Sequence, residues 1–277
     1  MIIRSDWHIH SEHSYDSSLA LVDIANEAMR EGLVGFGITD HVNFNEECYF
    51  EAIRASSAHV NSLRSEYPTM SLGVELTPVN KPEWEYLAMH GNRDGFEPRE
   101  SDKPLDMELA LTAEQIKEYG VEYVIGASHW RVDVPNRNEP CELEAMIREW
   151  HRQQMWLATD SRVTVLGHPW YHGRAMWYED FTVVPHSMHD ELFAALKENG
   201  KLIECNPDVL LSYKSSEKFH YQYAEFLREA FEYGLRVSYG SDSHNRYLDR
   251  REKVEELLRS VGFADGDFSE VIRKENA

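Results

Sequence analysis

Seven short apolar segments alternate with longer amphipathic segments, and this alternation limits the fold more than any other feature of the chain. Each apolar segment is rich in β-branched or aliphatic residues, as is typical of a strand buried on both faces. Strands that alternate with helices form parallel sheets, so a doubly wound sheet and a closed barrel both fit the pattern. The predicted strands are Ile2–Ile9, Leu33–Thr39, Met70–Leu76, Glu122–Ser128, Val163–Gly167, Lys201–Cys205 and Leu235–Gly240.

The segments between the strands have the apolar spacing of helices that pack by one face. The clearest helical patterns are Leu21–Gly32, Glu142–Asp160, His186–Gly200 and Glu217–Gly234. Residues 81–111 are rich in Glu, Asp, Pro and Gly, and we predict that they form an insertion or a lid. Since no linker divides the chain, we expect a single domain over residues 1–277.

Charge and composition exclude several classes of function. The formal charge is −21, so most of the surface would repel a long nucleic acid. No apolar run reaches the roughly 18 residues of a membrane helix, and the first residues lack the apolar core of a signal peptide. Three cysteines without CxxC spacing argue against a disulfide framework and a thiolate zinc site. We therefore expect a cytoplasmic protein that does not bind a membrane.

Histidines and carboxylates recur where the predicted strands end. The strand-end motifs are HIH, TDH, GVE, SH, GHP and SDSH, and the loop after the first motif adds Asp16. Active sites of α/β proteins assemble where the carboxyl ends of parallel strands meet. Chance placement at so many strand ends is improbable. The nine candidate metal ligands are His8, His10, Asp16, His41, Glu75, His129, His168, Asp242 and His244.

Nine nitrogen and oxygen donors are more than one metal ion needs. We expect two or three divalent ions, and a ligand set without sulfur suits zinc, manganese or iron. Three such ions would leave the pocket cationic inside an acidic protein. A cationic pocket favours a small dianion such as a phosphate monoester, and a metal-bound hydroxide would be available as the nucleophile.

The order of these motifs resembles the PHP (polymerase and histidinol phosphatase) family, and IECNPDVL and YGSDSH are similar to its histidinol-phosphatase-like branch. The resemblance covers nearly the whole chain. It implies an α/β fold that is a distorted (β/α)7 barrel of parallel strands, similar to a TIM barrel. It also implies a centre of two or three metals that hydrolyses phosphoesters.

The resemblance further implies which residues share an ion. The first ion would be held by His8, His10, Glu75 and Asp242. Glu75 would bridge to a second ion, with His41 and His129 as further ligands. The third ion would be held by Asp16, His168 and His244, and the nearby His13 is an alternative to Asp16. The histidines inside helical patterns, His59, His151 and His220, are predicted to be surface or packing residues.

Two residues are predicted to act in catalysis. Arg174 lies six residues after His168, where the branch often has an arginine, and its guanidinium could bind the phosphate. Asp242 could assist the leaving alkoxide. Other candidates near the motifs are Arg131, Arg246, Lys214 and His172, with Trp7, Trp130, Trp170 and Trp177 as pocket walls.

The leading hypothesis is a metal-dependent phosphatase acting on a small phosphate monoester, with histidinol phosphate as one candidate. The branch often has an arginine after its ExN motif, but Pro207 follows Asn206 here, which weakens the case for histidinol phosphate. A phosphodiesterase or exonuclease acting on short nucleotides is the alternative. A metal-binding regulatory module without catalysis should have lost ligands, and a barrel amidohydrolase usually needs a bridging lysine that is absent from these strand ends.

Overall fold

The seven predicted strands form one parallel sheet in the computed structural model, which describes residues 2–91, 95, 106–132, 142–171, 179–245 and 250–272. The strands follow one another around the sheet in chain order. They are β1 (Ser5–Ile9), β2 (Gly35–Ile38), β4 (Met70–Leu76), β7 (Tyr123–Gly126), β8 (Val165–Leu166), β9 (Leu202–Cys205) and β10 (Arg236–Tyr239). A two-residue strand, β3 (His41–Val42), pairs with β4.

The sheet nearly closes into a barrel through the residues that follow β10. The backbone amide of Asp242 donates to the carbonyl of His8 (2.7 Å), and that of His10 donates to Ser243 (3.0 Å). The closure brings the first strand next to the last. The predicted (β/α)7 barrel is therefore confirmed, and the doubly wound alternative is excluded.

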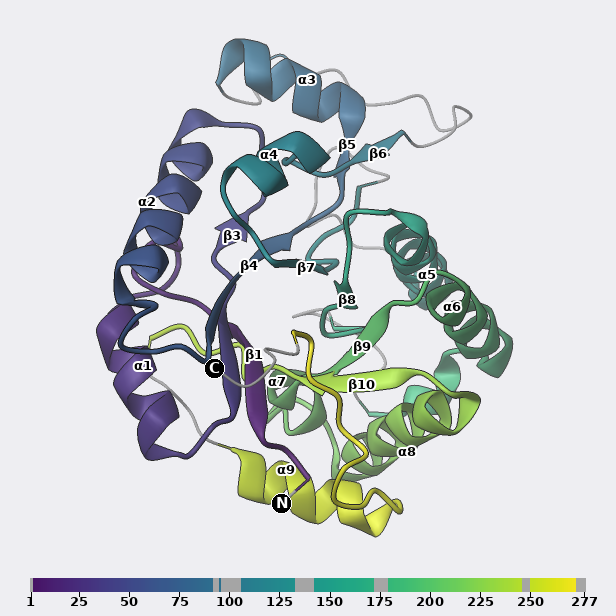
Figure 1. Cartoon of the computed structure of the whole chain (residues 1–277). Coiled ribbons are helices and arrows are strands. Elements are labelled where there is room, and N and C mark those ends of the chain that lie inside the picture. The colour runs from purple at the N-terminus through teal and green to yellow at the C-terminus, as the bar shows by residue number, and fades with distance from the viewer. Residues whose placement is uncertain are drawn as a thin grey trace.

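Helices surround the barrel, as Figure 1 shows. The four predicted helical patterns correspond to α1 (Leu21–Arg30), α5 (Leu143–Thr159), α6 (His186–Glu198) and α8 (Glu217–Tyr233). The remaining helical elements are α2 (Glu47–Leu63), α3 (Lys81–His90), α4 (Ala113–Glu118), η1 (Phe181–Val183), α7 (Pro207–Leu210) and α9 (Arg251–Ser260). Across the described part of the chain, no helix has the length and apolar character needed to span a bilayer.

Helix α8 illustrates how local sequence sets the limits of these elements. The Ser216 hydroxyl accepts a hydrogen bond from the Phe219 amide (3.1 Å), which satisfies a donor at the helix start. The helix ends at Gly234, whose φ of 98° is left-handed and is readily adopted by glycine. Buried aromatic residues of this helix, including Phe226, pack in the large core between the barrel and the helices.

A second, smaller core fills the inside of the barrel. Its members are Trp7, Tyr123, Ile125, Ala127, Val165 and Leu202. The Tyr123 hydroxyl donates to the backbone carbonyl of Trp7 (2.7 Å). A Cβ atom at Gly37 would lie 1.7 Å from that hydroxyl, so only glycine at this position leaves room for the tyrosine.

The region predicted to be an insertion or a lid begins as regular structure. Helix α3 starts at Lys81, and β5 (Val79–Asn80) pairs antiparallel with β6 (Met107–Glu108). Figure 1 shows α3 at the edge of the molecule, outside the ring of the other helices. Since 92–94 and 96–105 lie outside the described residues, the roles of insertion and lid stay predictions.

Candidate metal centre

The structure brings the nine predicted ligands together at the carboxyl ends of the barrel strands. Each comes from a strand end or from the loop that follows it, and neighbouring members are linked by distances below 4 Å between ligand atoms. Three overlapping groups have ligand atoms within 4.8 Å of one another. These are His8, His10, Glu75 and Asp242; His41, Glu75 and His129; and His10, Asp16, His41 and His244.

Glu75 of β4 lies in the middle of the centre and is fully buried. Its Oε1 is 2.9 Å from Nε2 of His168 and 3.4 Å from Nε2 of His129. Its Oε2 faces a different set of nitrogens at 3.0–3.4 Å, namely His41 Nδ1, His8 Nε2 and His10 Nε2. The two carboxylate oxygens therefore face opposite sets of imidazoles, as a carboxylate that bridges two ions must.

Asp242 completes the group around His8 and His10. Its Oδ1 lies 3.1 Å from Nε2 of His10 and 3.5 Å from Nε2 of His8. The two histidine nitrogens are themselves 3.1 Å apart. Asp6 and Ile9 of β1 pair with Phe36 and Ile38 of β2, so β1 has one extra residue between these pairs. This irregularity is a β-bulge, a feature that is common beside active sites.

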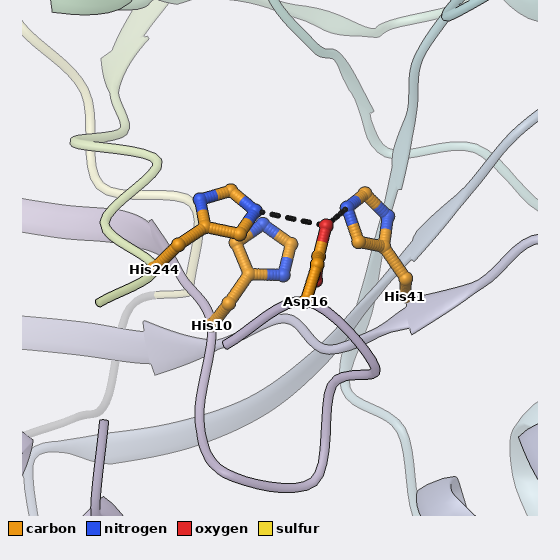
Figure 2. Close-up of side chains that lie close together, drawn as sticks. All are labelled: His10, Asp16, His41 and His244. Atoms are coloured by element: carbon orange, nitrogen blue, oxygen red, sulfur yellow. Dashed lines mark ion pairs between the residues drawn. The ribbon is translucent and has the colours of Figure 1, made fainter. Parts of the chain in front are cut away.

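Asp16 forms the outer part of the centre with two histidines, as Figure 2 shows. Its Oδ2 lies 3.3 Å from Nε2 of His41 and 3.4 Å from Nε2 of His244. The Ser14 hydroxyl donates to its other oxygen (2.8 Å) and holds the carboxylate in place. Asp16 is 30% exposed, so this part of the centre opens toward solvent.

His168 lies beside other ligands than the family resemblance implies, and His41 belongs to two groups. His168 was expected beside Asp16 and His244, but its Nε2 contacts Glu75 on the side of His129. His41 was expected with Glu75 and His129, and the structure groups it with both, but it also contacts Asp16 through its second nitrogen. The short strand β3 places His41 directly opposite Glu75 of β4, so one ring nitrogen faces Glu75 and the other faces Asp16.

Three imidazoles are held in one orientation by hydrogen bonds at Nδ1. The acceptors, each 2.8 Å away, are the Glu204 carboxylate for His8, the Thr77 hydroxyl for His129 and the Asp242 carbonyl for His244. Each Nδ1 can therefore donate a proton to its partner, which leaves each Nε2, directed at a carboxylate oxygen, to bind either a proton or a metal ion. Two facing lone pairs repel each other unless a proton or a metal ion lies between them. This tautomer is the one that metal-binding histidines commonly adopt.

Glu204 and Asn206 support the centre through contacts that were not predicted from the sequence. One Glu204 oxygen binds His8, and the other accepts the backbone amide of His168 (2.7 Å). The Asn206 side chain donates to Asp242 Oδ2 (3.1 Å). The available signal was a pair of polar residues two positions apart at the end of an apolar run, which places both side chains on the same side of β9.

Buried charges strongly influence protonation in the centre. Burial alone would raise the pKa of Glu75, but His41, His8 and His129 outweigh it and hold that pKa well below the usual range. Burial would lower the pKa of His41, but Glu75 and Asp16 raise it to about 10. His10 has a pKa lowered to about 3, by burial and by the positive charge of His41. Glu75 is therefore an anion that requires positive charge on both sides.

The backbone is strained at two of the predicted ligands. His168 has a φ of 24° and Asp242 a φ of 55°, and Trp170 beside the first has a φ of 62°. Residues with side chains rarely adopt these values, and such strain tends to occur at functional sites. The hydrogen bonds from the His168 amide to Glu204 and from the Asp242 amide to His8 help to hold both turns.

The remaining predicted residues have different environments. Arg174, His172, Trp177 and Arg246 lie outside the described residues, so their roles stay predictions. Among the predicted tryptophans, Trp7 lies in the barrel interior and Trp170 is fully buried. Trp130 is half-buried beside His129, with ring centroids 5.8 Å apart. It is therefore the described tryptophan that best fits a pocket wall.

The donor set fits divalent metal ions. Glu75 Oε2 is buried without a hydrogen bond from any described residue, although three imidazole nitrogens surround it. A buried carboxylate oxygen without a hydrogen bond destabilises the folded protein. A cation between this oxygen and the imidazoles would remove the destabilisation. Imidazole and carboxylate donors suit zinc, manganese and iron. The chemistry of the residues thus agrees with a metal centre of more than one ion.

Comparison with known proteins gives a consistent picture. The model of the PHP domain family matches residues 6–208. A probable phosphatase of Acetivibrio thermocellus is 38% identical over 73 residues, which are 26% of this chain and only 29% of that protein. The crystal structure of histidinol phosphate phosphatase from Lactococcus lactis, complexed with zinc, L-histidinol and phosphate, has a TM-score of 0.63 and 19% identity over 96% of each chain. At that identity, the structural likeness shows the shared fold alone.

Proposed function

The chain belongs to the PHP domain family, and from this premise we propose that it is a metal-dependent phosphatase that hydrolyses small phosphate monoesters. The observation that carries the proposal is the position of Glu75, whose two oxygens face separate sets of imidazoles at the barrel mouth. The name of the bacterial relative, a probable phosphatase, supports the same reaction class.

The geometry suggests how the residues would divide the ions. His8, His10, Asp242 and one Glu75 oxygen would hold the first ion, and the other Glu75 oxygen, His129 and His168 the second. Asp16, His41 and His244 would hold the third. When bound, divalent ions acidify water and neutralise the charge of a phosphate group.

The protein's own residues would prepare the reaction in two ways. Glu204 and Thr77 fix His8 and His129 in the metal-binding tautomer before substrate arrives, so little reorganisation is needed later. Asn206 holds one Asp242 oxygen, leaving Oδ1 directed at the centre. Asp242 remains the residue proposed to assist the leaving alkoxide, and Arg174 remains the proposed phosphate-binding cation.

The charge of the chain supports the proposed substrate class. The chain carries a net charge of −21, so its surface disfavours polyanions, while the metal centre would favour a single small dianion. Histidinol phosphate is one candidate, because a protein of the same fold was crystallised with L-histidinol and phosphate. Pro207 follows Asn206 directly, where the histidinol-phosphatase-like branch often has an arginine, so other monoesters are equally worth testing.

Hydrolysis of p-nitrophenyl phosphate tests the proposal against that of bis-p-nitrophenyl phosphate. We expect the monoester to be cleaved with the higher kcat/KM, the activity to disappear with a chelator, and zinc or manganese to restore it. A panel that includes histidinol phosphate then ranks the monoesters. Preference for the bis ester would replace the proposal by a phosphodiesterase, and activity that survives complete metal removal would refute it.

A further inference from the structure

A second group of metal-binding side chains lies apart from the candidate metal centre. It consists of Glu12 and His13 from the loop after β1 and His59 from α2. The group shares no residue with the three groups of the centre. Glu12 is 35% and His59 31% exposed, so an ion from solvent could reach them. From its helical pattern alone, His59 was expected to be a surface or packing residue.

The distances between the donor atoms suit a tetrahedral ion. Ligand atoms about 2.0–2.2 Å from zinc lie roughly 3.3–3.6 Å from one another at the corners of a tetrahedron. Here His13 Nε2 lies 3.1 Å from His59 Nδ1, and Glu12 Oε1 lies 3.6 Å from the same nitrogen. The two rings are nearly perpendicular, at 82°, so both nitrogens can point at a common position without stacking.

The carboxylate of this group is already held in place. Glu12 Oε2 accepts a hydrogen bond from the backbone amide of Leu21, at the start of α1 (2.7 Å). Its other oxygen is thereby directed toward His59. A carboxylate fixed in this way loses little side-chain freedom when it binds an ion, which favours affinity.

We propose that Glu12, His13 and His59 form an additional site for a zinc-like divalent ion, with water as the fourth ligand. Two imidazoles and one carboxylate suit zinc, cobalt or nickel, whereas calcium and magnesium prefer oxygen donors. The ion would connect the loop after β1 to α2. Because the same loop carries Asp16, the site would hold in place a loop that contributes to the metal centre.

The competing explanation is a simple hydrogen bond between the two imidazoles. One proton shared by His13 and His59 would account for their 3.1 Å separation, and Glu12 would then be an ordinary surface carboxylate. The two explanations differ in what zinc does to the protein. They can be separated by counting ions in variants that lack one ligand.

The decisive experiment first weakens the main centre. In the double variant Glu75→Gln/Asp242→Asn, zinc is titrated against a chromophoric chelator. Since the group of Asp16, His41 and His244 is unchanged in this variant, we expect up to two ions per chain to remain bound, and His59→Gln in this background to remove one of them. His186→Gln is the matched control, since His186 is also a helix histidine placed between carboxylates, Asp190 (3.2 Å) and Glu229 (3.3 Å). It should leave the number of bound ions unchanged.

The effect on the loop gives a second measurement. Zinc should slow amide hydrogen exchange in residues 11–19 of the double variant, and this slowing should become smaller once His59→Gln is added. Should the double variant fail to fold, the same comparison is made by elemental analysis of the otherwise unchanged protein, where His59→Gln should lose one ion per chain.

Two results would overturn the proposal. One is a double variant that binds no zinc while remaining folded, and the other is an ion count that His59→Gln leaves unchanged. Either would identify the cluster as an imidazole hydrogen bond. These results are distinct from a failure of the proposed function, which would appear as a full set of ions and parental activity in the Glu75→Gln/Asp242→Asn protein.

Discussion

Glu75 illustrates at the scale of one residue how burial and charge create a requirement for metal. Its side chain is fully buried, yet its oxygens lie within 3.4 Å of five imidazole nitrogens on two sides. Asp16 pairs with two of the predicted histidine ligands, His41 and His244, and is partly exposed. Loss of charge at Glu75 should therefore disturb two ions, whereas loss at Asp16 should disturb one.

The first prediction compares Glu75→Gln with Asp16→Asn, which are both changes from a carboxylate to an amide of similar shape. We expect Glu75→Gln to lower kcat/KM by more than about 100-fold, beyond the range typical of residues that only support a ligand. Asp16→Asn should lower kcat/KM roughly tenfold and should remove at most one ion per chain. Steady-state kinetics and elemental analysis measure both effects. Parental activity in Glu75→Gln would refute the bridging role, and parental activity with an unchanged ion count in Asp16→Asn would exclude Asp16 as a ligand.

The second prediction concerns Arg174, which lies outside the described residues. If its guanidinium binds the substrate phosphate, Arg174→Ala should lose about 2–4 kcal/mol of transition-state stabilisation, or roughly 30- to 1000-fold in kcat/KM. The metal content should not change, because arginine is not a ligand. Arg174→Lys should recover only part of the activity, since lysine lacks the paired donors. Unchanged kinetics in the alanine variant would assign phosphate binding to Arg131, Lys214 or the metals.

At the scale of the elements, adjacent strands must approach closely for one strand to support a ligand on another. Glu204 of β9 reaches His8 of β1 only because Gly240 follows β10 between them. A Cβ atom at Gly240 would lie 2.2 Å from Glu204 Oε1 and 2.4 Å from His8 Cβ. The glycine therefore preserves the contact that orients His8.

The third prediction is that Gly240→Ala damages the metal centre as well as stability. Overpacking at this position should lower the free energy of unfolding by about 1–3 kcal/mol. Displacement of His8 should also reduce metal content and kcat/KM. The control is Gly200→Ala, where φ is +66° and no atom lies within 4 Å of the added Cβ. That variant should lose about 1–2 kcal/mol through backbone strain alone and keep its ions. Urea unfolding and elemental analysis compare the two, and an intact metal content in Gly240→Ala would contradict the prediction.

At the scale of the whole molecule, the metal centre joins strands that are far apart in the sequence. Its ligands extend from His8 to His244 and come from both ends of the chain. The backbone closes the barrel at the same place, through the hydrogen bonds between His8, His10 and the residues after β10. Ions bound at this position would hold the closure together, and they would bind the folded chain far better than the unfolded one.

The fourth prediction is that the metal centre of the purified protein holds two or three divalent ions per chain and that their removal destabilises the fold. At ion concentrations about 100 times the dissociation constant, one site contributes about 2.7 kcal/mol. Chelation should therefore lower the Tm by roughly 5–10 °C, and zinc or manganese should restore it. Elemental analysis and thermal unfolding followed by circular dichroism provide the measurements. Protein purified without chelator that holds no ion and shows no change in Tm would refute the metal centre.

The order of strands and the positions of the candidate ligands follow from the sequence by itself. Buried parallel strands appear as short apolar runs, and all seven predicted runs contain the observed strands of the barrel. Because the carboxyl ends of parallel strands meet at one mouth, residues that follow different runs must lie close together. For this reason the nine predicted ligands could be placed in one group without knowledge of any distance.

Only the tertiary structure decides which of these residues face one another. The pairing of β3 with β4 sets His41 opposite Glu75, and the left-handed turn at His168 directs that side chain to the other Glu75 oxygen. Neither feature has a periodic signal, because a two-residue strand and a strained turn depend on contacts with distant segments. The support from Glu204 and the cluster of Glu12, His13 and His59 are hidden from the sequence for the same reason. Side-chain direction at a strand end is set by the neighbours that the fold supplies.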